Sequence, residues 1–90
     1  MTDDRTERDA MRGRRAEQLL GDELVIEIFE TLRSEYMKAW ENSQARDTDG
    51  RERLWQAVQI VGKVRSHLQA MVGDGKIAQA DIERMARGMK

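Results

Sequence analysis

Hydrophobic positions recur along this chain at alternating steps of four and three residues, in two stretches separated by a polar segment. The first stretch consists of Val25, Phe29, Leu32, Tyr36 and Ala39, and the second of Ala57, Val61, Val64, Leu68 and Met71. This spacing is typical of an α-helix with an apolar seam that packs against another helix. The polar segment carries turn residues at 47–50. The pattern therefore predicts an all-α chain built on an antiparallel helical hairpin of two long helices, over about residues 22–73.

The first hairpin helix is expected from about residue 23 to residue 43. Gly21 followed by Asp22 predicts a helix stop and a new N-cap. A strand over residues 24–29 is an alternative, because Val-Ile-Glu-Ile is rich in β-branched side chains. The helical period continues to Trp40, however, which is too long for a strand.

The second hairpin helix is expected from about residue 51 to residue 72. Asp49 and Glu52 fit a capping box with Asp49 in the cap position, and Gly73-Asp74-Gly75 predicts the helix stop. Gly62 lies inside this helix, where glycine costs about 1 kcal/mol relative to alanine. Two interpretations are open: an exposed glycine without special contacts, or a point where another backbone crosses closely.

Short helices are expected to flank the hairpin, at about residues 6–20 and 79–88. The second of these carries an apolar stripe at Ala78, Ile82, Met85 and Met89. Residues 1–10 are polar and predict a flexible N-terminus. The expected organisation is a flexible segment at 1–10 and a single helical domain at 11–90.

Composition limits the size and the location of this domain. Ninety residues with 39% hydrophobic and 37% charged residues suit thin helical layers. A chain of this length is often marginally stable alone, and oligomerisation is a common remedy, so a homo-oligomer is expected. The chain has no cysteine, no secretory signal pattern and no apolar run that could span a membrane. These features predict a cytoplasmic protein.

The two halves of the hairpin differ in charge, although the chain as a whole carries only −1. Residues 21–49 hold eight acids and three bases, and residues 50–90 hold eight bases and four acids. The halves should attract each other, or attract the opposite half of a neighbouring copy. Exposed pairs add only about 0–1 kcal/mol each, so their larger effect is on register and on the choice of partner.

Trp40 and Trp55 stand at similar distances on either side of the turn. Both would lie near the tip of an antiparallel hairpin, where they would cap the core. The alternative is that one of them is an exposed anchor for a partner protein, since tryptophan is enriched at interface hot spots.

Arg12, Arg14 and Arg15 form a basic cluster near the N-terminus that could contact the phosphates of a nucleic acid. The four acids upstream of it, between residues 3 and 9, would weaken such binding. Basic residues of the second hairpin helix could also touch nucleic acid, but pairing with the acidic helix is the simpler interpretation.

No pattern predicts catalysis, a metal or a cofactor, and the chain is not expected to be an enzyme. The segment 46–50 resembles part of a calcium-binding loop. In such a loop Ala45 and Gln56 would occupy the positions where acidic ligands are required. His67 is the only histidine and flanks a seam position, which favours a role at the rim of the seam. Glu27, Glu30 and Glu35 are spaced for the solvated face of their helix.

Four segments resemble small helical proteins of tailed phages, prophages and gene transfer agents, which are encoded among packaging and head genes. These segments are RGRRA at 12–16, EYMKAW at 35–40, DTDGRERLW at 47–55 and VGKVRSHL at 61–68. The resemblance implies a virion-assembly or DNA-packaging role, for example that of a small-terminase-like protein whose helical hairpin forms a ring. Small terminases carry an N-terminal DNA-binding helix-turn-helix, for which residues 1–20 are too short.

The expected function is therefore that of a non-enzymatic helical assembly protein acting through self-association and through a protein partner, such as a packaging or head protein. One alternative is a small nucleic-acid-binding regulator that uses Arg12, Arg14 and Arg15. Another is a small inhibitor that docks on a host protein through its acidic helix.

Overall fold

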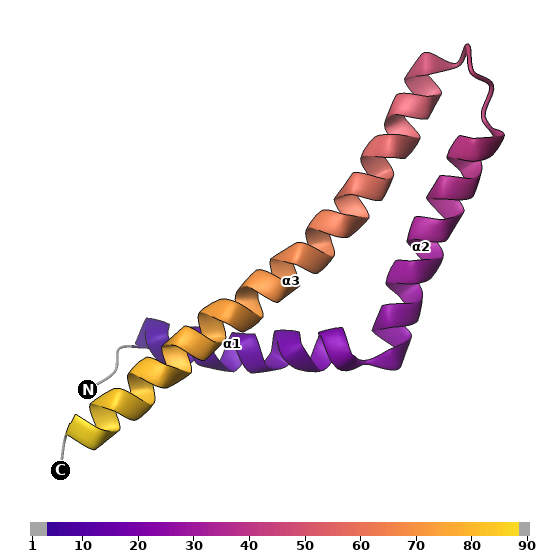
Figure 1. Ribbon diagram of the computed structural model, residues 1–90. Coiled ribbons are helices and arrows are strands. Elements are labelled where there is room, and N and C mark those ends of the chain that lie inside the picture. Colours follow the sequence, from indigo (N-terminus) through magenta and orange to yellow (C-terminus); the bar gives the residue numbers. More distant parts are fainter. Residues whose placement is uncertain (1–3, 89–90) are drawn as a thin grey trace. The chain divides into compact units, whose positions relative to one another are not determined.

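The computed structural model describes residues 4–88, which form three helices and no strand (Figure 1). The helices are α1 (Asp4–Gly21), α2 (Glu23–Asn42) and α3 (Thr48–Gly88). The chain divides into two compact units. Unit 1 contains residues 1–21 and 67–90, and unit 2 contains residues 22–66, so that α3 contributes to both. The predicted all-α class is confirmed.

Helix α2 begins where the sequence predicts it. The side chain of Asp22 is its N-cap and accepts hydrogen bonds from the backbone amides of Leu24 at 2.8 Å and Val25 at 3.2 Å. These bonds satisfy two of the amides that a helix start leaves unpaired. The strand alternative for residues 24–29 is excluded, because these residues lie within α2.

Helix α3 begins earlier than predicted, and its cap is a different residue. Asp47 accepts a hydrogen bond from the amide of Gly50 at 3.1 Å, and its carbonyl accepts the first helical bond from Arg51. The prediction that Asp49 caps the helix is wrong. Asp49 lies in the first turn of α3, where its negative charge interacts favourably with the positive end of the helix dipole.

In unit 2, α2 and the part of α3 from residue 48 to residue 66 run in opposite directions (Figure 1). The predicted seam positions on these two segments are only half-covered. Val25, Phe29, Leu32, Tyr36, Ala57 and Val61 are half-buried, whereas Ala39 and Val64 are exposed. No residue of α2 is buried. The hairpin of unit 2 therefore leaves much of its apolar surface uncovered.

The predicted helix stop at Gly73-Asp74-Gly75 is wrong, because α3 continues through it to Gly88. A glycine that stops a helix commonly adopts a positive φ, and neither Gly73 nor Gly75 does so. The separate C-terminal helix expected at 79–88 is thus the last part of α3. Of its predicted stripe, Met89 lies outside the described residues, Ala78 is buried, Ile82 is half-buried and Met85 is exposed.

Unit 1 is formed by α1 and the C-terminal part of α3, which meet at Gly13 and Gly75. A Cβ atom placed on Gly13 would lie 2.6 Å from Cα of Gly75, so the two backbones approach as closely as only glycine allows. Ala10, Ala16 and Ala78 are the buried apolar side chains among the described residues. The core of unit 1 is therefore a thin layer of small residues.

A close backbone crossing was one of the two interpretations of Gly62, but the structure places the crossing at Gly13 and Gly75 instead. A Cβ atom on Gly62 would meet nothing within 4 Å in this chain. Leu68 and Met71, the last two predicted seam residues, belong to unit 1 and are half-buried. Residues 4–10 of the predicted flexible segment lie in α1, and residues 1–3 lie outside the described residues.

Candidate interaction surfaces

The turn of unit 2 is held by Arg51, which contacts the C-terminal end of α2. Its guanidinium donates to the carbonyl of Trp40 at 3.3 Å, to the carbonyl of Ser43 at 3.4 Å and to the hydroxyl of Ser43 at 3.0 Å. The same guanidinium lies 4.2 Å from the centre of the Trp40 ring. A cation at this position donates hydrogen bonds to carbonyls at the C-terminal end of α2 and interacts favourably with the negative end of the helix dipole.

Replacing Arg51 with methionine is expected to lower the free energy of unfolding by about 1–3 kcal/mol, because hydrogen bonds from a charged donor are lost in a half-buried site. Arg51→Lys should recover only part of this, since lysine keeps the charge but not the planar fork. Urea unfolding followed by circular dichroism measures the change. Arg53→Met is the matched control, because Arg53 is exposed and makes no hydrogen bond to a described residue. Equal losses in the two methionine variants would contradict the assignment.

A groove lined by both polar and apolar side chains lies beside this contact and brings the two predicted partner anchors together. It has a volume of about 520 Å³ and is lined by Trp40, Ala45, Thr48, Arg51, Glu52 and Trp55. Trp40 is half-buried, whereas Trp55 leaves 53% of its surface exposed. A large exposed tryptophan beside a groove is a typical anchor of a protein–protein interface.

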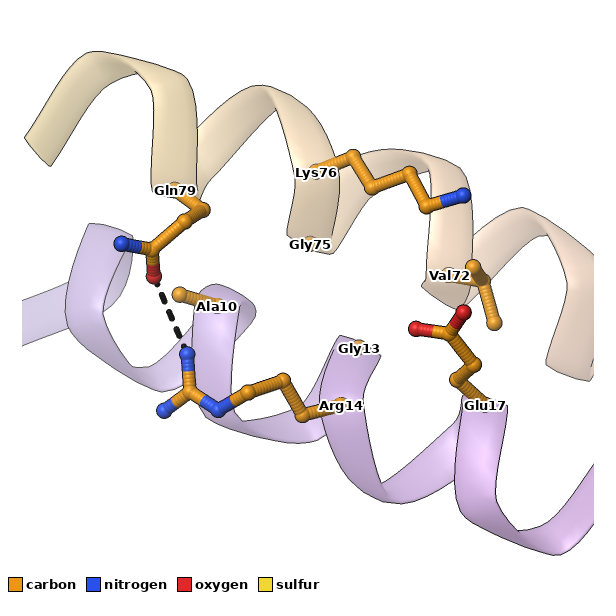
Figure 2. Close-up of a pocket in the computed structure, with 8 residues that line it drawn as sticks. All are labelled: Ala10, Gly13, Arg14, Glu17, Val72, Gly75, Lys76 and Gln79. Carbon is orange, nitrogen blue, oxygen red and sulfur yellow. Dashed lines mark hydrogen bonds between the residues drawn. The ribbon is translucent and has the colours of Figure 1, made fainter. Parts of the chain in front are cut away.

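A second groove follows the crossing of α1 and α3 in unit 1 (Figure 2). Figure 2 shows Gly13 and Gly75 facing each other and Arg14 reaching Gln79, to whose side-chain oxygen it donates at 3.0 Å. The groove has a volume of about 220 Å³, which is small for a ligand pocket, and its charged lining residues are Arg14, Glu17 and Lys76. It results from the close approach of the two helices at Gly13 and Gly75.

The predicted cluster of Arg12, Arg14 and Arg15 is exposed, but α1 distributes its members around the helix. Arg14 is turned towards α3 by its bond to Gln79. The arginines that share a face of α1 stand three or four residues apart. They are Arg5, Arg8, Arg12 and Arg15, all exposed. Sequence reasoning missed this basic stripe because it grouped neighbours in sequence, although the helical spacing was there to be read.

The residues considered for catalysis or metal binding lie on the surface. Glu27, Glu30 and Glu35 are exposed on α2, and His67 is exposed on α3. Asp47 acts as a helix cap. Within residues 4–88, no three His, Cys, Asp or Glu side chains lie close enough to hold a metal ion. None of the helices in this range is long and apolar enough to cross a membrane.

Large apolar side chains remain exposed on both units. They are Met11, Leu19, Leu24, Ile28, Trp55, Ile60, Val64, Ile77 and Met85, with exposed fractions between 38% and 65%. Among the described residues, no large side chain is fully buried. The chain alone thus covers little of its own apolar surface.

Comparisons of the chain with protein-family models, curated proteins and solved structures found no significant match.

Proposed function

We propose that the protein is a non-enzymatic assembly protein that self-associates through the apolar faces of its helices. The observation that carries the proposal is the burial pattern: within residues 4–88 the buried side chains are three alanines, whereas nine large apolar side chains are exposed. Hydrophobic burial is the main favourable term in folding, and each large apolar side chain contributes about 1.5–3 kcal/mol when it is fully buried. A second copy of the chain would supply the missing cover.

The groove at the hairpin tip supports a second part of this function, the binding of a protein partner. Trp55 is exposed there although it lies next to Trp40 and Arg51. In the form of the proposal that the resemblance favours, the partner is a packaging or head protein of a phage-type particle, and the assembly is a ring like that of a small terminase. The alternative is that the protein docks on a host protein through its acidic helix α2.

Self-association predicts that stability depends on protein concentration. The thermal unfolding midpoint should rise by several degrees when the concentration is raised about a hundredfold, because mass action favours the associated state. Circular dichroism at both concentrations measures the two midpoints. A midpoint that does not move with concentration would contradict self-association.

A second candidate function, nucleic-acid binding, is favoured by the basic stripe on α1. Arg5, Arg8, Arg12 and Arg15 lie on one exposed face, and none of the four pairs with a described acid. Guanidinium groups in a row can follow a phosphate backbone without reading its sequence. The stripe thus supports non-specific contact with nucleic acid, as an assembly that handles DNA would need.

If the stripe neutralises four phosphates of duplex DNA, the logarithm of the binding constant should fall against the logarithm of salt concentration with a slope of about −3.6. Removing two members in Arg8→Ala/Arg12→Ala should reduce the slope by about 2. Fluorescence anisotropy with a labelled duplex measures it. Arg14→Ala is the control, because it removes one charge from another face of α1. Binding that is undetectable at low salt would exclude this function.

A further inference from the structure

Two exposed pairs of apolar side chains lie on one face of unit 2. Leu24 and Ile28 stand one turn apart on α2, with 63% and 48% of their surfaces exposed, and Ile60 and Val64 stand one turn apart on α3, with 58% and 48% exposed. We call these four residues the hairpin patch. Each pair is a ridge formed by side chains at positions i and i+4.

Helical geometry places both ridges on the same side of the hairpin. Leu24 and Ile28 each precede a half-buried seam residue of α2 by one position, and Ile60 precedes the half-buried Val61 in the same way. One position is a rotation of about 100° around the helix. In an antiparallel pair, equal rotations away from the contact line bring side chains to the same face.

The two ridges also overlap in level along the hairpin, at the end away from the turn. Arg51 contacts the carbonyl of Trp40 at the tip, and the two helices advance by the same rise per residue in opposite directions. Ile28 on α2 therefore lies level with the stretch of α3 between Ile60 and Val64. The two halves of the hairpin patch thus overlap in level on one face of unit 2, and the half-buried seam residues Phe29 and Val61 directly follow Ile28 and Ile60 in the sequence.

Charged residues follow the hairpin patch on the same face, towards the tip. Glu35 precedes the half-buried Tyr36 on α2, and Arg53 precedes the half-buried Leu54 on α3. Both are exposed, and neither makes an ion pair or a hydrogen bond with a described residue. More generally, no ion pair joins α2 to α3 within the described part of unit 2. The opposite charges of the two helices are therefore available to another molecule.

We infer that the occupant of this face is the same face of a second copy, related by a two-fold axis parallel to the helices. This inference rests on the proposed self-association and specifies its geometry. The axis places α2 of one copy on α3 of the other, so that Leu24 and Ile28 meet the partner's Ile60 and Val64. It also places Glu35 beside the partner's Arg53. The result is a four-helix bundle with both tips at the same end.

Charge selects this arrangement. Within unit 2, α2 carries five acids and two bases, whereas residues 48–66 of α3 carry four bases and two acids. Placing α2 on the partner's α3 therefore brings opposite charges together. Turning the second copy end over end would set α2 on α2 and α3 on α3, so that helices of like charge would face each other.

Cysteine cross-linking tests the geometry cleanly, because the chain contains no cysteine of its own. Ile28→Cys and Val64→Cys are prepared separately, mixed as full-length chains and oxidised. A cross-linked heterodimer is expected in the mixture, and much less product in either variant alone. Glu30→Cys mixed with Val64→Cys is the control, because Glu30 lies on the opposite face of α2. Cross-linking in the separate variants but not in the mixture would overturn the inferred axis.

Charge reversal supplies an independent readout. Glu35→Arg should raise the dissociation constant of the dimer by about tenfold or more, and adding Arg53→Glu should restore it, whereas Glu30→Arg should change it little. Analytical ultracentrifugation measures all three. An oligomer that none of these variants weakens would overturn the inference and leave self-association standing. A wild-type chain that is monomeric would overturn both.

Discussion

Replacing Gly75 with alanine is expected to lower the free energy of unfolding by about 1–3 kcal/mol. Its new Cβ atom would lie 2.6 Å from Cα of Gly13 and 3.1 Å from the carbonyl oxygen of Asp9. Both atoms belong to the backbone of α1, so no flexible side chain can move aside. The helices of unit 1 would have to separate. Gly13→Ala is expected to have a similar effect, since its Cβ would meet the backbone of α3.

Gly73→Ala, in the same helix, is a control for which the opposite change in the free energy of unfolding is expected. A Cβ atom on Gly73 would meet nothing within 4 Å, and alanine is favoured over glycine inside a helix by about 1 kcal/mol. Gly73→Ala should therefore stabilise the protein where Gly75→Ala destabilises it. Urea unfolding followed by circular dichroism compares the two. If both substitutions stabilise the chain equally, the close crossing of α1 and α3 is not present in solution.

Replacing Phe29 with alanine is the second substitution for which we expect a large effect. Phe29 is a half-buried seam residue of α2, and truncating a fully buried phenylalanine costs about 3–5 kcal/mol. Partial burial reduces this to about 2–3 kcal/mol in the single chain, and cover by a second copy would restore the larger value. Thermal and urea unfolding at high and low concentration separate the two contributions.

The controls for Phe29→Ala are chosen on the same helix. Phe29→Leu retains most of the apolar volume and should cost less than about 1.5 kcal/mol. Glu30→Ala changes the neighbouring exposed residue and should stay within about 0.5 kcal/mol of the wild type. A loss for Phe29→Ala no larger than that for Glu30→Ala would show that the seam assignment on α2 is wrong.

The sequence predicted the start of a helix well where one side chain determines that start. The period of the apolar positions identified α2, and Asp22 marked its start, because a capping carboxylate needs only its own neighbouring amides. The sequence misplaced the cap of α3 by two residues. Asp47 and Asp49 are both capping residues, and the choice between them depends on the path of the turn.

The end of α3 could not be predicted, because glycine has two opposite roles. At the end of a helix it permits a positive φ, and inside a helix it permits another backbone to approach. Gly75 has the second role through Gly13, a contact between residues far apart in the sequence. The small residues Ala10, Gly13 and Ala16, spaced by three, were the available signal.

The contact of Arg51 at the hairpin tip was missed for a related reason. From the sequence, the basic residues of the second hairpin helix, Arg51 among them, were expected to pair with the acidic helix or to touch nucleic acid. In the structure it binds the end of α2, because the turn returns the chain to Trp40 and Ser43. The tryptophans were recognised as tip residues, since the symmetry of their positions about the turn could be read directly from the sequence.

The absolute mass of the protein in solution tests self-association most directly. Light scattering after size exclusion, at several concentrations and at low and high salt, gives this mass without assumptions about shape. We predict a closed oligomer of at least twice the chain mass of 10.4 kDa. It should weaken at high salt if opposite charges fix its register. A mass of 10.4 kDa at every concentration would contradict the proposal that a second copy covers the exposed apolar faces.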